Sequence, residues 1–169
     1  MLAKTPKSKK SPELFVMIIP SPLGKLLAYA SCDALLKMDF LDEECNILEQ
    51  PNEILLQTKK ELGEYFIGLR KNFDVPISPC GSDFQLKAWK VLSKISYGST
   101  ISYGQEAILI SNPKACRAVA NANAKNPISI IIPCHRVILG DGKIGGYSGG
   151  VWRKQYLLDL ENSVPGKTI

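Results

Sequence analysis

Apolar and polar residues alternate in three short segments near the beginning of the chain. The first two, residues 14–19 and 25–30, lie on either side of the sequence Ser21-Pro22-Leu23-Gly24, and the third covers residues 35–41. Alternation with a period of two is typical of a strand that buries one face, and two such runs around a short turn predict a β-hairpin. We therefore expect a β-hairpin followed by a third strand.

The spacing of apolar residues then becomes helical. Five apolar side chains between residues 52 and 70 fall on one stripe of an amphipathic helix: Ile54, Leu55, Leu62, Phe66 and Leu69. Residues 72–81 contain Pro76, Pro79 and Gly81, a composition typical of a linker. We predict the α+β fold class, with a basic, disordered tail over residues 1–10, an amino-terminal domain over residues 11–78 and a second domain over residues 82–169.

The second domain is predicted to be mainly helical, beginning with a helix over residues 83–94. Ser102 and Gln105 have the spacing of a capping box, which predicts a short helix to about residue 110. Asn112 as N-cap and Pro113 at the first helical position predict another helix, ending near residue 124. Two short helices around a tight turn indicate a helix-turn-helix, although helical hairpins that do not bind DNA are also common.

Charge divides the chain into two unlike halves. Residues 11–80 carry six Lys and Arg against eleven Asp and Glu, whereas residues 81–169 carry eleven against five. A polyanion is therefore expected to meet the second half, although an ordinary solvated face is the alternative reading of so modest an excess.

Five cysteines, an odd number, favour reduced thiols over a framework of disulfides. They include no CxxC pair, and the chain has a single histidine, so no metal site is predicted. Neither a signal peptide nor a membrane segment is indicated. We expect a protein of the cytoplasm, or of the nucleus if the source is eukaryotic.

The one histidine, His135, directly follows Cys134 in the sequence Pro133-Cys134-His135-Arg136. A free thiol with a pKa of about 8.5 is mostly protonated at neutral pH, and a neighbouring base is a common means of obtaining the nucleophilic thiolate. Adjacent side chains of an extended segment point to opposite faces, so a turn or a bridging water would be required. A buried cysteine beside a hydrogen-bonded histidine is the alternative interpretation.

The sequence around this pair resembles the O6-alkylguanine-DNA alkyltransferases, also called methylated-DNA–protein-cysteine methyltransferases. The resemblance runs from about Ser82 to Glu161, and its main segments are Phe84-Gln85, Tyr97-Gly98, Ser102-Tyr103-Gly104, Arg117-Ala118-Val119, Asn126-Pro127, Pro133-Cys134-His135-Arg136-Val137-Ile138 and Gly146-Tyr147-Ser148-Gly149-Gly150. The first 80 residues match more loosely. The resemblance implies a small RNase H-like amino-terminal domain, followed by a helical domain with a helix-turn-helix and the active-site cysteine.

The reaction that this resemblance implies is DNA repair by a single, stoichiometric transfer of an alkyl group to Cys134 after base flipping, with O6-alkylguanine as the substrate and O4-alkylthymine as a second candidate. Glu161 would orient His135, which would act on Cys134 through a bridging water. Asn126 would order the active-site turn, and Tyr103 would crowd a phosphate and hydrogen-bond the base. Exposed glutamates at helix ends are common, so a surface position is the alternative for Glu161.

The implied partner is double-stranded DNA, bound by a monomer through the minor groove. Arg117 would enter the base stack in place of the extruded nucleotide, and Ser102, Ala118 and Asn121 would join Tyr103 and Arg117 at the DNA. A helix is about 10–12 Å wide and the minor groove only about 6 Å, so a helix trimmed by alanines suits that groove. Alanines chosen for helix propensity are the alternative explanation.

The resemblance assigns the wall of the substrate pocket to Tyr147 and Ser148, and we expect Val137 and Lys154, which lies one helical turn after Gly150, to belong to the pocket as well. Ser148 would donate to O6 as the leaving oxygen gains charge. For Lys154, an ordinary surface charge is the competing interpretation. No cofactor is indicated. Two other function classes remain open: a relative that binds lesions without transferring the alkyl group, which the presence of Cys134 disfavours, and a DNA-binding regulator or cysteine hydrolase.

Overall fold

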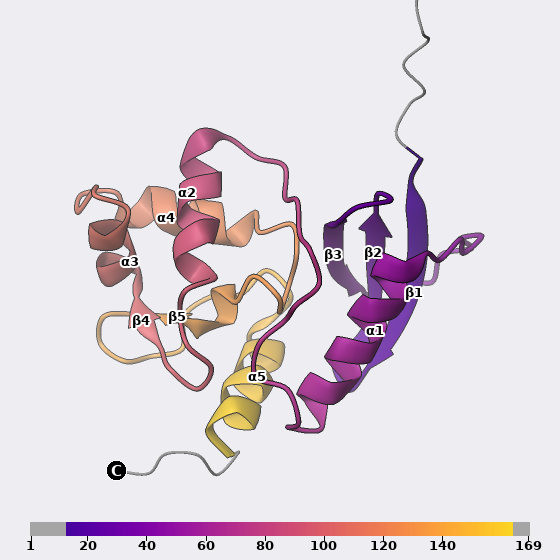
Figure 1. Cartoon of the computed structure of the whole chain (residues 1–169). Coiled ribbons are helices and arrows are strands. Elements are labelled where there is room, and N and C mark those ends of the chain that lie inside the picture. Colours follow the sequence, from indigo (N-terminus) through magenta and orange to yellow (C-terminus); the bar gives the residue numbers. More distant parts are fainter. Residues whose placement is uncertain (1–12, 164–169) are drawn as a thin grey trace, which may run out of the picture.

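The computed structural model describes residues 13–163, so the predicted basic tail lies outside the described residues (Figure 1). Three antiparallel strands, β1 (Phe15–Ser21), β2 (Gly24–Ala30) and β3 (Leu35–Leu41), form a sheet in the order β1-β2-β3. The predicted hairpin is confirmed, with Ser21 opposite Gly24 at the turn. Alternate residues of the strands point into the core, among them Leu26, Ala28 and Met38.

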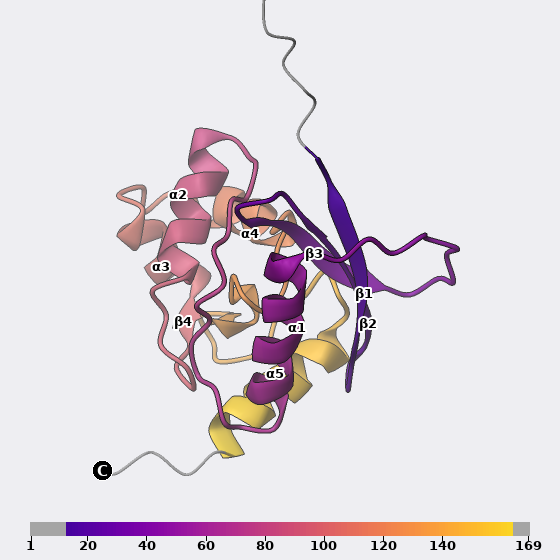
Figure 2. The same cartoon turned by 45° about the vertical axis from the view of Figure 1, so that its right-hand side comes forward.

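Helix α1 (Glu53–Phe66) packs against this sheet (Figures 1 and 2). It begins after Asn52, whose side-chain oxygen accepts a hydrogen bond from the backbone N–H of Leu55 at 3.1 Å. The helix is shorter than predicted because Gly68 adopts a left-handed conformation. Leu69 therefore lies outside the helix and is exposed, contrary to the predicted stripe.

The second half contains helices α2 (Asp83–Leu92), α3 (Tyr103–Leu109), α4 (Cys116–Ala124) and α5 (Val151–Ser163). Two short strands, β4 (Ile101–Ser102) and β5 (Val137–Ile138), pair in parallel, and the 3₁₀ helix η1 (Cys134–Arg136) precedes β5. The predicted capping box of Ser102 and Gln105 is present at the start of α3. A mixed α and β fold with a sheet domain followed by a helical domain is thus confirmed.

The predicted start of the second short helix is wrong. Ser111 has a φ of 63°, and the residues after it form a separate turn in which the N–H of Ala115 bonds to the carbonyl of Asn112 at 2.9 Å. Helix α4 therefore begins only at Cys116 and has no side-chain cap. The pair α3 and α4 still packs as a helical hairpin.

Backbone hydrogen bonds join the two halves. The N–H of Met38 on β3 bonds to the carbonyl of Pro127, and the N–H of Ser129 bonds to the carbonyl of Met38, both at 2.8 Å. The segment that leads to Cys134 is therefore attached to the edge of the amino-terminal sheet. Among residues 13–163, none of the helices has the length and apolar character that crossing a membrane requires.

Candidate active site

Cys134 is the first residue of η1, at the end of a tight turn, and only 6% of it is exposed. Within that turn Ile130 has a φ of 73°, which is strained for a β-branched residue. The amide of Asn126 fastens the turn. Its Nδ2 donates to the carbonyl of Ile132 at 2.7 Å and to Sγ of Cys134 at 3.2 Å, and its Oδ1 accepts from the N–H of Ile128 at 3.0 Å.

The electrostatic surroundings of Cys134 act in opposite directions. Burial raises the pKa of the thiol to about 11, whereas the hydrogen bond from Asn126 and the positive charge of Lys154 favour the thiolate. The thiol is therefore not ionised by its surroundings alone, so a thiolate at neutral pH requires a base that accepts its proton.

His135 is fully buried, and its Nε2 lies 2.9 Å from Oε1 of Glu161. Burial lowers the pKa of His135, so the ring is neutral at pH 7. Because an ionised carboxylate can only accept, Nε2 carries the hydrogen and Nδ1 keeps its lone pair. Nδ1 is buried and has no hydrogen-bond partner among the described residues, so it is free to accept a proton.

Glu161 is buried rather than exposed, which rules out the surface position considered from the sequence. Burial by itself would raise the pKa of this carboxyl, but hydrogen bonds from His135 and Arg136 outweigh it and hold the pKa at about 2. Arg136 donates from Nε to Oε2 at 3.0 Å and from Nη2 to Oε1 at 2.9 Å. The backbone N–H of Gly98 adds a bond to Oε2 at 3.0 Å.

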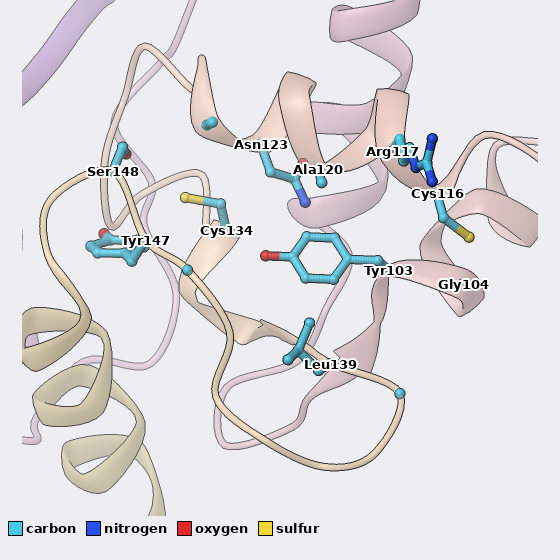
Figure 3. Close-up of a pocket in the computed structure, with 13 residues that line it drawn as sticks. Tyr103, Gly104, Cys116, Arg117, Ala120, Asn123, Cys134, Leu139, Tyr147 and Ser148 are labelled. Atoms are coloured by element: carbon cyan, nitrogen blue, oxygen red, sulfur yellow. The ribbon is translucent and has the colours of Figure 1, made fainter.

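A cavity of about 730 Å³ opens beside Cys134 (Figure 3). Helices α3 and α4, η1, the residues directly after β5 and the glycine-rich loop (residues 146–150) form its wall, through Tyr103, Gly104, Cys116, Arg117, Ala120, Asn123, Ala124, Cys134, Leu139, Gly140, Gly146, Tyr147 and Ser148. The hydroxyl of Tyr103 points toward the Cys134 side of the cavity, and Arg117 lies on the other side of the Tyr103 ring (Figure 3). The thiol thus faces a space large enough for a purine base.

The structure brings five of the proposed site residues together in this wall: Cys134, Tyr103, Arg117, Tyr147 and Ser148. His135, Glu161 and Asn126 lie buried behind the thiol. Ala118 and Asn121 are exposed on α4, outside the cavity, and Ser102 serves as the N-cap of α3.

Two residues assigned to the pocket do not line it. The side chain of Val137 lies in the hydrophobic core. Lys154 is completely buried instead of forming a surface charge, and its Nζ donates to the carbonyls of Val137 and Gly146 at 2.6 and 3.1 Å. Burial lowers the pKa of Lys154 to about 8. Through these two hydrogen bonds, Lys154 links β5 to the beginning of the glycine-rich loop.

Sequence reasoning missed a buried polar pair beneath the cavity. Glu106 on α3 is fully buried, and its Oε2 accepts a hydrogen bond of 2.7 Å from Nδ2 of Asn123 on α4. Burial raises the pKa of Glu106 to about 7, and its Oε1 has no partner among residues 13–163. A carboxylate on a short amphipathic helix is usually solvated, so the pattern gave no signal for this pair.

The amino-terminal sheet also supports the glycine-rich loop. A Cβ on Gly149 would lie 2.6 Å from the ring of Phe40 on β3, so any other residue there would have to displace that ring. The Phe40 ring in turn makes an edge contact with Tyr147, at 6.5 Å between centroids. Arg153 pairs with Asp42 and donates to the carbonyl of Gly149 at 2.8 Å. The loop that carries Tyr147 and Ser148 is thus held from the sheet side.

In the part of the chain that the structure describes, no group of three or more His, Cys, Asp or Glu side chains could hold a metal ion. All five cysteines are free. Fold and site together define a two-domain protein in which a helical hairpin and a glycine-rich loop enclose a cavity beside one buried thiol, which a buried histidine follows directly in the chain.

Comparison with known proteins identifies the family. Residues 14–79 match the ribonuclease-like domain of 6-O-methylguanine DNA methyltransferase, and residues 83–163 match its DNA-binding domain. A methylated-DNA–protein-cysteine methyltransferase of Methanosarcina acetivorans is 41% identical over 156 residues, which cover 89% of this chain and 99% of the relative. A Mycobacterium bovis protein of the same name is 52% identical over 103 residues, or 61% of this chain and 62% of the relative.

Solved structures show the same fold. The crystal structure of Mycobacterium tuberculosis O6-methylguanine methyltransferase superposes with a TM-score of 0.83 at 39% identity, covering 92% of this chain and 96% of the other. A structure of Mycobacterium tuberculosis OGT in complex with DNA gives 0.80 at 41% identity, covering 89% and 94%. The chain belongs to the methylated-DNA–protein-cysteine methyltransferase family.

Proposed function

We propose that this chain repairs DNA by transferring an alkyl group from O6-alkylguanine in duplex DNA to Sγ of Cys134, once per molecule. The observation that carries the assignment to this thiol is that Cys134 is the one buried cysteine of the chain, faces the cavity and is followed by a neutral histidine with an available nitrogen. The other cysteines are exposed and have no such base.

The reaction balances without a co-reactant. Nδ1 of His135 takes the thiol proton through a bridging water, and Glu161 stabilises the resulting imidazolium. The thiolate forms a bond to the alkyl carbon while the bond between that carbon and O6 breaks. The electron pair stays on O6, and the guanine anion regains one proton. A thioether is a poor leaving group, so Cys134 is not regenerated.

Base flipping is required because O6 of guanine lies within the paired stack. In our proposal the extruded base enters the cavity between Tyr103 and the glycine-rich loop, while Arg117 on α4 occupies the gap in the duplex. Burial raises the pKa of Tyr103, so its phenol remains a hydrogen-bond donor for the base. Ser148 donates to O6 as negative charge develops there.

The proposed contact with DNA is made by α4 in the minor groove. Its exposed side chains include Arg117 and two small ones, Ala118 and Ala124, which leave the helix narrow on that face. Ser102, the N-cap of α3, and Asn121 on α4 belong to the same helical hairpin. We infer that one monomer acts on each lesion and that the protein acts in the cytoplasm, or in the nucleus if the source is eukaryotic, where thiols stay reduced. O4-alkylthymine is a second candidate substrate.

The mass of the intact protein, measured after mixing with duplex DNA that contains O6-methylguanine, tests this function. We expect one methyl group per molecule, located by peptide mapping on Cys134. Cys134→Ser should take up none, whereas the matched variant Cys116→Ser, which changes a second thiol in the same cavity wall, should be methylated normally. Binding without a mass change would indicate a lesion-binding protein, and repeated turnover would indicate a hydrolase.

A further inference from the structure

Glu161 receives hydrogen bonds from both domains. Beside His135 and Arg136, the hydroxyl of Tyr65 donates to Oε1 at 2.8 Å. Tyr65 belongs to α1 of the amino-terminal domain and is separated from Glu161 by 96 positions. Both residues are buried, at 0% and 4% exposure, so water does not compete for this bond. The amino-terminal domain therefore touches the carboxylate that orients His135.

Aromatic packing fixes the position of the Tyr65 hydroxyl. The Tyr65 ring lies 5.4 Å from the rings of Phe66 and Phe73 and 5.9 Å from the ring of Tyr97, measured between centroids. The guanidinium of Arg136 lies over the Tyr97 ring, 5.8 Å from its centroid. The two side chains other than His135 that donate to Glu161, those of Tyr65 and Arg136, are thus both held by one aromatic cluster.

The Tyr65 hydroxyl remains a donor throughout the physiological pH range. Burial, together with the charge of Glu161 and the hydrogen bond to it, raises the pKa of Tyr65 well above its ordinary value. The hydroxyl cannot accept a bond from Glu161 either, because the carboxylate is ionised and has no hydrogen to give.

Oε1 of Glu161 accepts hydrogen bonds from three residues: from the Tyr65 hydroxyl, from His135 Nε2, and from Nη2 and Nε of Arg136. The hydrogen bonds from Tyr65 and Arg136 lower the basicity of this oxygen. They therefore weaken the stabilisation that Glu161 gives to a protonated His135. The other charged or titratable groups near this centre are Tyr97 from the segment after α2, with Lys71 above its ring, and Lys154 on α5. The charges of Arg136 and Lys154 oppose protonation of His135.

We propose that Tyr65 is a positioning residue for alkyl transfer, whose hydroxyl shares the charge of Glu161 and thereby sets the proton affinity of His135. This inference rests on the proposed function because it takes His135 as the base for Cys134. The hydrogen bond from Tyr65 to Glu161 nevertheless affects the pKa of His135 whether or not DNA is present. The amino-terminal domain then contributes to the chemistry through Tyr65, in addition to holding the active-site turn.

The test is the titration of His135 by NMR in the full chain without DNA. The chain has one histidine, so its imidazole signals can be assigned without ambiguity. Tyr65→Phe removes the hydroxyl and keeps the ring. Because Oε1 becomes more basic, we expect the pKa of His135 to rise by about half a unit to one unit, in keeping with a shared hydrogen bond to a charged group. The acidic limb of the pH profile of alkyl transfer, which follows protonation of His135, should move to higher pH by a similar amount.

Tyr97→Phe is the matched control. It removes a hydroxyl from the same aromatic cluster, but that hydroxyl bonds to the backbone carbonyl of Leu160 at 3.5 Å and not to Glu161. The His135 titration should not change in this variant. Replacing Tyr65 by 3-fluorotyrosine keeps the ring and its packing but makes the hydroxyl more acidic and a stronger hydrogen-bond donor. The pKa of His135 should then fall, opposite to the change expected for Tyr65→Phe.

An unchanged His135 titration in Tyr65→Phe, with only a lower melting temperature, would show that Tyr65 is merely structural and would overturn the proposal. A shift in the opposite direction would overturn it as well. If instead His135 shifts as expected but wild-type protein gains no methyl group on Cys134, the proposed function fails and the inference about His135 stands.

Discussion

Asn126 holds Cys134 directly: its Nδ2 lies 3.2 Å from Sγ and, through its other hydrogen, bridges to the carbonyl of Ile132. The same side chain therefore fastens the strained turn and stabilises negative charge on the sulfur of Cys134. Turn geometry and thiol ionisation are coupled through a single amide.

Asn126→Ala is expected to impair alkyl transfer through ionisation of Cys134. Its hydrogen bond favours the thiolate, so its loss raises the pKa of the thiol further. We expect the pH profile of transfer to move upward by about one unit and the rate at pH 7 to fall roughly tenfold. Single-turnover rates between pH 6 and 10 measure this, with Asn162→Ala, an exposed change on α5, as control. A lower rate with an unshifted profile would mean that Asn126 only shapes the turn.

Glu106→Gln is expected to stabilise the protein at alkaline pH. The folded-state pKa of about 7 lies above the unfolded value, so the folded protein binds this proton more tightly and loses stability as the pH rises from about 4.5 to 7. Gln cannot ionise and still accepts from Asn123. Above pH 7 the variant should gain on the order of 2–3 kcal/mol in free energy of unfolding, and near pH 4 little.

Urea unfolding at pH 4.5 and pH 8 measures the effect of Glu106→Gln. Asp159→Asn, which removes an exposed carboxylate from α5, is the control and should show no such pH dependence. Equal stability changes at both pH values for Glu106→Gln would show that the carboxyl is not held neutral by burial.

Local signals predicted most of the secondary structure. The alternation before residue 42 and the capping box at Ser102 act within a few residues, so they survive folding unchanged. Asn112 and Pro113 were misleading because Ser111 takes a left-handed conformation and starts a separate turn before α4. Capping preferences indicate which residues can begin a helix. They do not indicate whether the preceding turn allows the helix to begin at that residue.

The site was predictable only in part. Cys134 and His135 are adjacent in sequence, so their association is visible without a structure. The surroundings of Glu161 are not, because Tyr65 lies 96 positions away and no periodicity links them. For the same reason the burial of Lys154 and the pairing of Glu106 with Asn123 follow from how α3, α4 and α5 pack, which pattern alone does not specify.

Arg117 and Tyr103 are expected to matter more for duplex DNA than for a free base. Both line the cavity, but neither is bonded to Cys134, His135 or Glu161, so they should support the flipped nucleotide and not the ionisation of the thiol. Arg117→Ala and Tyr103→Phe should slow repair of O6-methylguanine in duplex DNA by about tenfold or more, in proportion to a flipping cost of a few kcal/mol. Parallel rates with a free O6-alkylguanine base, which needs no flipping, should fall much less. Equal losses on both substrates would contradict this division of roles.

Glu161→Gln is expected to damage both the fold and the reaction. Every neighbour of the carboxylate is a donor, namely Tyr65, His135, Arg136 and the N–H of Gly98. A carboxamide in either orientation turns its own N–H groups toward donors and leaves the Arg136 cation, which is 6% exposed, without a carboxylate. Breaking a buried pair in this way costs about 3–5 kcal/mol.

The destabilisation caused by Glu161→Gln should depend on pH. The folded-state pKa of about 2 lies below the unfolded value, so the carboxylate stabilises the wild type above about pH 4.5 and this stabilisation is lost as the pH falls toward 2. The difference in unfolding free energy between wild type and variant should therefore be largest near neutrality and shrink in acid. Adding Arg136→Met, which removes the stranded cation, should recover part of the stability but not the transfer rate, since His135 would still lack its carboxylate. Normal stability at pH 7 in the single variant would mean that Glu161 does not hold this centre together.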